Sequence, residues 1–339
     1  KINIEYHATK EDRRGGNKLD LQPHKSDICE MTSHQINSIN LNYNFVSLDG
    51  KHRLNAYAST QAINRSSYYG ANQDPNAYGK TNDLTYLTGA MANHKLDRFL
   101  FAKADITYGL EFSSNSLDDR IEGYDIRTQQ TANIFGGYVQ SEWKSNKLNM
   151  LLGARADKHS LLNTPVISPR VNLLYKPATN LQLRASYSSG YRAPQVYDED
   201  LHVTQVGGES VRIQLAENLR PEYSHSTSLS ADYYVRINEN LQANFLFEGF
   251  YTVLNDVFAL RTIGHDTNTQ TMIQERYNAS GATVLGASLT AKVSYKDFLV
   301  ISAAYTLQSS RYKETEYWSE DHSVEGTDKL LRSPDDYGF

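Results

Sequence analysis

Apolar and polar residues alternate along most of this chain with a period of two. In LQLRASYS (181–188) the apolar positions are Leu181, Leu183, Ala185 and Tyr187, and polar residues lie between them. LNMLLGARAD (148–157), TSLSADYYVR (227–236) and LQANFLFEGFY (241–251) follow the same pattern. A period of two is typical of β-strands with two unlike faces, whereas an amphipathic helix repeats every 3.6 residues. The chain is therefore predicted to be all-β.

The predicted connections alternate between short and long. Short polar turns are expected at 48–52, 95–97, 145–147, 177–180, 237–240 and 296–297, and longer loops at about 9–34, 66–81, 114–129, 159–165, 191–222, 264–270 and 313–330. In an antiparallel up-and-down sheet, successive connections lie at opposite ends, so each kind of connection would share one rim. Transmembrane β-barrels show this asymmetry, with short periplasmic turns and long extracellular loops. Soluble sandwiches with Greek-key connections have no reason to sort their loops in this way.

Composition is consistent with a chain that crosses a membrane by strands. No window of 18 apolar residues exists, which argues against a transmembrane helix, and the mean hydropathy is −0.58. A spanning strand needs only about 9–11 residues with every second one apolar. The 24 tyrosines outnumber 11 phenylalanines and 2 tryptophans, and tyrosine suits the aromatic belts at membrane interfaces.

Charge and cysteine content exclude other classes. The net charge is −5 and no basic stripe is present, so a nucleic-acid partner has no electrostatic basis. Cys29 is the only cysteine, so no intrachain disulfide can form.

Several charged residues fall on the non-apolar faces of the predicted strands: Arg155, Arg170, Arg184, Arg236, Asp157, Asp232 and Glu248. An eight-stranded barrel is filled by packed side chains and has little room for them. The set therefore favours a wide lumen that is wet or filled by another domain. Each charge taken singly is expected to pair across neighbouring strands.

A motif that runs through two strands and a long loop identifies a family. ISPRVNLLYKPATNLQLRASYSSGYRAPQVYDEDLH (167–202), followed by ENLRPEYSHSTSLSADYY (217–234), resembles the barrel of TonB-dependent outer-membrane receptors. YNASGATVLGASL (277–289) and LLRSPDDYGF (330–339) resemble later strands of the same family, although Ser288 stands where an acidic residue is usual. SSYYGANQDPNAYG (66–79) is similar to receptors of the Bacteroides group.

The resemblance implies an antiparallel barrel of about 22 strands around a plug domain, in the bacterial outer membrane. About 14 strands are expected in this chain, and nothing in it resembles the plug or its TonB-contacting box. Residues 1–339 are therefore expected to be the central part of the barrel. The implied partners are the TonB complex, acting through a plug outside this chain, the lipid bilayer and a scarce bulky nutrient. Siderophore and cobalamin receptors are the most similar members, so a ferric siderophore, haem or cobalamin is the expected cargo, and an oligosaccharide is the alternative.

The motif residues are expected to be a structural element of the family: Gly190, Tyr191, Arg192, Ala193, Pro194, Asp198, Pro221 and Glu222. Pro194 lacks the N–H that a ladder requires and should end the strand. Arg192 is expected to pair with a carboxylate of the lumen or the plug. The alternative makes the loop that follows, with Tyr197, Asp198, Glu199, Asp200 and His202, part of a ligand vestibule.

Ligand contacts are expected in the long loops, where aromatic and adaptable polar residues gather: Tyr68, Tyr69, Gln73, Tyr78, Tyr197, His202, Tyr317, Trp318 and His322. The alternative for these aromatics is an interfacial belt or packing between loops. His202, His265 and His322 are also candidates for an axial haem ligand, although a loop histidine is usually only solvated.

Enzyme and metal signatures are not evident in the sequence. No H-E-x-x-H, P-loop or G-x-S-x-G occurs, and neither a catalytic residue, a resident cofactor nor a resident metal is expected. Asp118, Asp119, Glu122 and Asp125 could supply oxygens to calcium, but their spacing fits a solvated acidic loop better. His225, between Ser224 and Ser226, is the one candidate for a barrel hydrolase. A passive porin and a surface adhesin are the remaining alternatives to a receptor.

Overall fold

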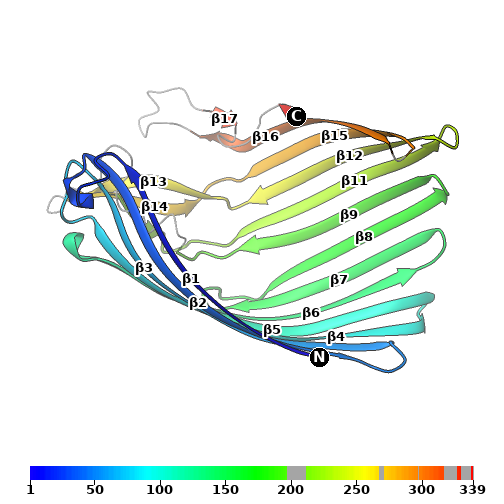
Figure 1. Cartoon of the computed structure of the whole chain (residues 1–339), viewed down its shortest axis with the longest axis horizontal. Coiled ribbons are helices and arrows are strands. Elements are labelled where there is room, and N and C mark those ends of the chain that lie inside the picture. Colours follow the sequence, from blue (N-terminus) through cyan, green and yellow to red (C-terminus); the bar gives the residue numbers. More distant parts are fainter. Residues whose placement is uncertain (197–210, 267–270, 297, 317–326, 330–336, 339) are drawn as a thin grey trace.

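The computed structural model describes residues 1–196, 211–266, 271–296, 298–316, 327–329 and 337–338 (Figure 1). Its strands are β1 (Ile2–Gly16), β2 (Ile28–Val46), β3 (His52–Ala71), β4 (Tyr78–Phe99), β5 (Ala102–Ile121), β6 (Ile126–Lys144), β7 (Leu148–His159), β8 (Val166–Ala178), β9 (Leu181–Arg192), β10 (Val211–Leu215), β11 (Glu222–Arg236), β12 (Leu241–Asn255), β13 (Phe258–Asp266), β14 (Thr271–Asn278), β15 (Ala282–Tyr295), β16 (Leu299–Glu316), β17 (Thr327–Lys329) and β18 (Tyr337–Gly338). Two 3-10 turns, η1 (Pro23–Lys25) and η2 (Glu122–Tyr124), lie in the loops. No helix in this part of the chain has the length and apolar character needed to cross a bilayer.

One antiparallel sheet of 15 strands contains most of the chain. Its order follows the sequence, β1 to β9 and then β11, β12, β15, β16 and β17, with the short β18 also paired to β16. Figure 1 shows a curved, open sheet with β1 near one edge and β16 near the other. The prediction of an all-β, up-and-down antiparallel wall, part of a larger barrel, is confirmed.

The two faces of this sheet differ as the alternation predicts. Leu229, Phe247 and Leu289 lie on one face of neighbouring strands, and each has about half or more of its side chain exposed. We call this apolar face the outer face, because exposed large apolar side chains suit contact with lipid. Glu248 and Ser288 pair across β12 and β15 on the opposite, inner face.

The loops at one end are shorter than the sequence suggested. Residues 9–34 were expected to form a loop, but β1 continues to Gly16 and β2 begins at Ile28, with only 17–27 between them. The next two expected loops are shortened in the same way. β3 ends at Ala71 and β4 begins at Tyr78, and β5 ends at Ile121 and β6 begins at Ile126. Strands of 19–22 residues exceed the 9–11 or so that a bilayer needs. Beyond the membrane both faces of a strand meet water, and the polar sequence that results resembles a loop.

One turn and one hairpin also differ from expectation. The turn expected at 95–97 lies instead at Leu100 and Phe101, after a bulge between Leu96 and Phe99. The segment around 264–270 was expected to be a simple loop of the main sheet. Instead β13 and β14 form a second sheet with β10, which pairs parallel to β14. In Figure 1, β13 and β14 lie at the loop end, opposite the short turns of β8–β9 and β11–β12.

Candidate ligand-binding rim and inner wall

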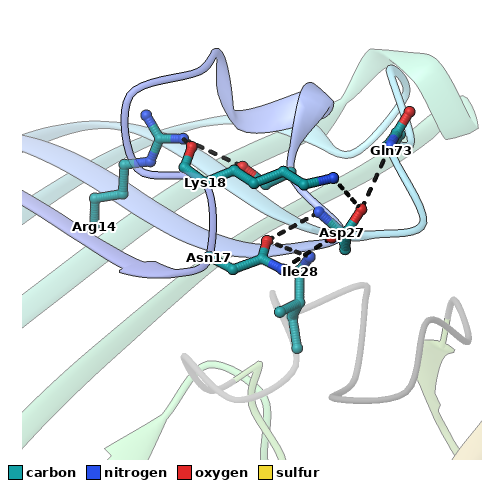
Figure 2. A network of polar contacts seen from close by, with 7 residues as sticks. Arg14, Asn17, Lys18, Asp27, Ile28 and Gln73 are labelled. Atoms are coloured by element: carbon teal, nitrogen blue, oxygen red, sulfur yellow. Dashed lines mark hydrogen bonds and ion pairs between the residues drawn. The ribbon is translucent and has the colours of Figure 1, made fainter.

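The loop between β1 and β2 is attached to the loop between β3 and β4 through one carboxylate. Asp27 accepts hydrogen bonds from Lys18 Nζ at 2.6 Å, Asn17 Nδ2 at 3.0 Å and, more weakly, Gln73 Nε2 at 3.4 Å (Figure 2). The backbone N–H of Asn72 also donates to the Asp27 carbonyl at 2.7 Å. The hydrogen bond from Lys18, the largest of these effects, holds the pKa of Asp27 below its usual value. The rim on this side is therefore cross-linked by polar contacts.

The four candidates at the β3–β4 loop do not share one surface. Tyr68 is 0% exposed, packs with Cys29 and Ala77, and donates its hydroxyl to the Asp74 carbonyl at 2.8 Å. These contacts make Tyr68 part of the packing between loops, which was the alternative to a role in ligand binding. Tyr69 follows Tyr68 in the strand and lies on the inner face of the ladder. Tyr78 lies opposite Tyr68, their ring centroids 4.7 Å apart, and remains 38% exposed.

His24 is a rim residue that sequence reasoning did not single out. Its Nδ1 lies 3.0 Å from the Tyr78 hydroxyl, and the two rings meet edge-on with centroids 5.9 Å apart. It sits in η1, in the middle of a stretch that was taken as one long loop. Proline at position 23, which favours the start of a helical turn, was the only local signal.

The family motif anchors the base of the second sheet. Arg192 pairs with Glu222 at 3.6 Å and its guanidinium lies 5.4 Å from the Phe258 ring centroid. Glu222 also accepts a hydrogen bond from the backbone N–H of Phe258, the first residue of β13. The expected partner of Arg192 was a carboxylate of the lumen or the plug, and the structure places Glu222 of the same motif there.

A second contact secures the other strand of the hairpin at the same base, because Asn278 pairs directly with Phe258. Asn278, the last residue of β14, donates from Nδ2 to the carbonyls of Arg220 at 2.9 Å and Asp256 at 2.8 Å. Arg220 forms an ion pair with Asp256 at 2.5 Å. Pro221 connects this contact to Glu222. We call the set Arg192, Arg220, Glu222, Asp256, Phe258 and Asn278 the hairpin clamp.

After Arg192 the chain runs along the inner wall. The ladder between β8 and β9 ends at Arg170 and Ser188, so Gly190 and Tyr191 pair only with β11. Ala193 and Pro194 are buried, and the N–H of Val196 donates to Gln130 of β6 at 2.8 Å. As predicted, the strand ends before Pro194. Tyr197, Asp198, His202, Tyr317, Trp318 and His322 lie outside the described residues.

Charges on the inner face pair with one another. Arg155 contacts Asp157 at 2.8 Å and Glu111 at 3.0 Å, and the Tyr57 hydroxyl donates to Glu111 at 2.6 Å. Arg184 pairs with Asp232 at 3.5 Å in the same way. Of the predicted pairings across neighbouring strands, Arg184–Asp232 joins β9 to β11, whereas Arg155 pairs within β7 and reaches across β6 to Glu111 of β5. Hydrogen bonds and ion pairs thus connect β3, β5 and β7 on the inner face.

The other site hypotheses find little support in the geometry. Asp118 and Asp119 point to opposite faces, Asp118 bound by Arg120 and Arg127, and Asp119 by Thr81 and Arg65. No group of three or more metal-ligating side chains occurs within the described ranges. His225 contacts Tyr187 at 2.9 Å, whereas Ser226 bonds to Thr252 on the opposite face. A serine–histidine pair is therefore not formed there. His265 is exposed in β13.

The comparisons with known proteins agree with this architecture. Residues 6–338 match the family model described as TonB dependent receptor-like, beta-barrel. Among solved structures, the outer membrane transporter YddB from Escherichia coli is 11% identical, with a TM-score of 0.68 over 91% of this chain and 45% of that one. The siderophore receptor PirA from Acinetobacter baumannii is 15% identical, with a TM-score of 0.64 over 84% and 46%. No curated protein sequence matches the chain.

A third structure extends the same picture. The FrpB iron transporter from Neisseria meningitidis is 15% identical, with a TM-score of 0.62 over 91% of this chain and 50% of that one. At these identities the likeness concerns the fold, and the chain spans about half the length of these structures or less. The family match covers nearly every residue. The chain belongs to the TonB-dependent receptor family and forms part of its β-barrel.

Proposed function

We propose that this chain is the central wall of an outer-membrane receptor that binds a scarce, bulky nutrient at its loop end and imports it into the periplasm. The single observation that supports this most is the family match from residue 6 to residue 338. The energy would come from the TonB complex, acting through a plug domain that lies outside this chain. The loop end would face the exterior and the short turns the periplasm, as in other barrels of the outer membrane.

The proposed cargo is a metal chelate: a ferric siderophore, haem or cobalamin. Two of the similar structures are a siderophore receptor and an iron transporter. The proposed contacts are the exposed or half-buried residues of the rim, Tyr69, Gln73 and Tyr78, together with Tyr197, His202, Tyr317, Trp318 and His322. An aromatic and amide-rich rim suits a large amphipathic ligand. Fold alone does not select among these cargos.

Binding to the full-length receptor in detergent tests the proposal. Ferric siderophores, haem, cobalamin and malto-oligosaccharides would each be titrated while the fluorescence of Trp143 and Trp318 is followed. Saturable, nanomolar binding of one chelate is expected. If only an oligosaccharide binds, the proposed metal-chelate cargo is wrong and the oligosaccharide takes its place. Ion conductance with no ligand binding at all would indicate a passive pore.

A Tyr78→Ala variant tests the proposed site separately. Tyr78 is 38% exposed at the start of β4 and contacts His24 of η1 and Tyr68 at the end of β3, so its loss should weaken nutrient binding without unfolding the barrel. Tyr86→Ala, eight positions further along the same outer face of β4, is the matched control. Equal affinities of both variants and the parent would remove Tyr78 from the site.

A further inference from the structure

Two histidines face each other at the short-turn end of the main sheet. His52 is the first residue of β3, and the ladder places it directly opposite His94 of β4. Their Nδ1 atoms lie 2.6 Å apart, and their rings meet edge-on with centroids 4.9 Å apart. Leu54, two positions further along β3, is 39% exposed, so the pair belongs to the outer face. The two histidines are 42 residues apart in the sequence, and only the register of the strands brings them together.

The contact between the two Nδ1 atoms holds a single proton. A neutral imidazole has one N–H donor and one lone-pair acceptor, so one Nδ1 donates and the other accepts. If this proton moves to the other nitrogen of its own ring, the lone pairs of both Nδ1 atoms converge on one point. A metal ion can then take the place of the proton, because the neutral imidazole is the commonest metal ligand among protein side chains.

Tyr108 of β5 orients the histidine on the middle strand. Its hydroxyl lies 3.1 Å from His94 Nε2, and the two rings stack with centroids 5.6 Å apart. When Nδ1 of His94 binds a metal, the ring proton lies on Nε2, and the Tyr108 oxygen accepts it. A histidine ligand usually has such a partner on its second nitrogen, because the partner sets the tautomer and the direction of the ring.

The two rings need to move little to hold a metal ion. Zinc–nitrogen bonds are about 2.0–2.1 Å long, so two nitrogens on one tetrahedral ion lie about 3.4 Å apart. The Nδ1 atoms must therefore separate from their present 2.6 Å by less than the radius of an atom. His52 is exposed and has room for this shift, whereas His94 is half-buried and is held by Tyr108.

The turn between β2 and β3, next to the pair, does not oppose a cation. Its one basic side chain, Lys51, forms an ion pair with Asp97 at 2.7 Å. Asp49 in the same turn accepts hydrogen bonds from the Ser47 hydroxyl and from the backbone N–H of Lys51. The bond from Ser47 is the largest cause of the lowered pKa of Asp49, and the charge of His52 adds to it. The pair thus lies beside a carboxylate that stays negative.

We propose that His52 and His94 chelate a divalent transition-metal ion through their two Nδ1 atoms, and that the ion fastens β3 to β4 at the short-turn end. Imidazole suits zinc, copper and nickel, whereas calcium and magnesium prefer oxygen ligands. The described side chains supply two ligands and no third, so water completes the coordination and the ion can exchange. The site takes the free ion, lies at the end of the sheet opposite to the rim, and depends on neither the cargo nor the plug.

Copper titration of the full-length receptor tests the proposal. The receptor is purified in detergent without a histidine tag and is treated with a chelator beforehand. One copper site with two imidazole nitrogens in its electron paramagnetic resonance spectrum is expected in the parent. Tyr108→Phe keeps both ligands and should weaken copper binding about tenfold, because it removes only the partner of Nε2. His94→Asn should bind more weakly still and lose the two-nitrogen signal.

His225→Asn is the matched control. His225 also lies on the outer face and contacts a tyrosine hydroxyl, that of Tyr187, at 2.9 Å. It has no histidine opposite it, because the ladders pair it with Val253 and Ser189. The control should therefore bind copper like the parent and keep the two-nitrogen signal.

Three results would overturn the proposal. They are a parent without a two-imidazole copper signal, equal copper affinity of His94→Asn and the parent, and calcium binding at this site as tight as copper binding. If His94→Asn does not fold, His52→Asn replaces it, because His52 is exposed at the first position of its strand. Zinc should also raise the urea midpoint of the parent more than that of His52→Asn, since an ion that binds only the folded chain stabilises it. An equal rise in both would reject the site.

Discussion

Glu222 serves two partners from two different strands. It pairs with Arg192 at the end of β9 and accepts the backbone N–H that opens β13. The Glu222 side chain is only 16% exposed, so water could not fully replace it as the partner of these groups. Removing one member of such a pair leaves the other without a partner, which costs about 1–3 kcal/mol. Glu222 thus links the end of β9 to the start of β13, two segments that are far apart in the sequence.

Glu222→Ala should loosen the β13–β14 hairpin. The amide of Phe258 loses its acceptor, so hydrogen exchange across 258–266 should accelerate about five- to 150-fold, which corresponds to about 1–3 kcal/mol. Glu222→Gln keeps an acceptor oxygen and should recover part of the protection. Glu217→Ala, an exposed acid in the same connection, is the control. Equal protection in all three variants would mean that the clamp does not hold the hairpin.

Asp27 gives the rim a defined response to acid. Its pKa is lowered chiefly by the hydrogen bond from Lys18. A carboxylate with a lowered pKa stabilises the folded loop above its unfolded pKa, near 4, and loses this contribution as the pH falls through the folded value. Proteolysis of the 17–27 loop by pepsin should therefore accelerate as the pH falls below about 4, and it should do so more in the parent than in a variant that lacks the Asp27 carboxylate. Asp27→Asn should show the loosened loop already at pH 7, while Asp20→Asn should behave like the parent.

At the scale of elements, alternation predicted the strands well and their ends poorly. The strand around Leu181 to Tyr187 and the turn at 237–240 follow directly from the pattern, because one face of the strand is apolar and the other is polar. The upper part of β5 has no apolar face, and its polar sequence was taken for a loop. The parallel pairing of β10 with β14 joins segments about 60 residues apart, so no local pattern could indicate it.

Gly281 explains part of the family motif at the start of β15. Its φ is +112°, a conformation that only glycine adopts without strain, and an added Cβ would collide with the carbonyl oxygen of Leu254. Gly281→Ala should destabilise the barrel by about 1–3 kcal/mol. Gly264→Ala is the control, because a Cβ there meets no atom within 4 Å. Urea unfolding in lipid would measure both, and equal midpoints would contradict the strain argument.

At the scale of the whole molecule, the candidate site is less predictable than the fold. Tyr68 and Tyr69 are neighbours in sequence, but one is buried in the loop and the other lies on the inner face. Their roles depend on which loop residues pack against them. Tyr68 is buried because Asp74 and Ala77 of the β3–β4 loop contact it. The hairpin clamp was visible only as a motif, because its partners Asp256, Phe258 and Asn278 come from a later hairpin. The alternation that predicts a strand lies within a few consecutive residues. The candidate site is formed by several loops that are far apart in the sequence.

The contrast between the two faces gives a direct test of how the sheet meets the membrane. Leu289 and Ser288 are consecutive in β15, and Leu289 is 50% exposed on the outer face while Ser288 pairs with Glu248 on the inner face. If lipid covers the outer face, Leu289→Arg should lower the free energy of folding into bilayers by about 2–4 kcal/mol near the midplane. Ser288→Arg places the same charge beside Glu248 on the polar wall and should cost less than 1 kcal/mol, since an ion pair becomes available. Tryptophan fluorescence during urea-driven unfolding of the full-length receptor in vesicles would measure both. Equal losses would mean that the two faces meet the same solvent, and the assignment of the outer face to lipid would have to be abandoned.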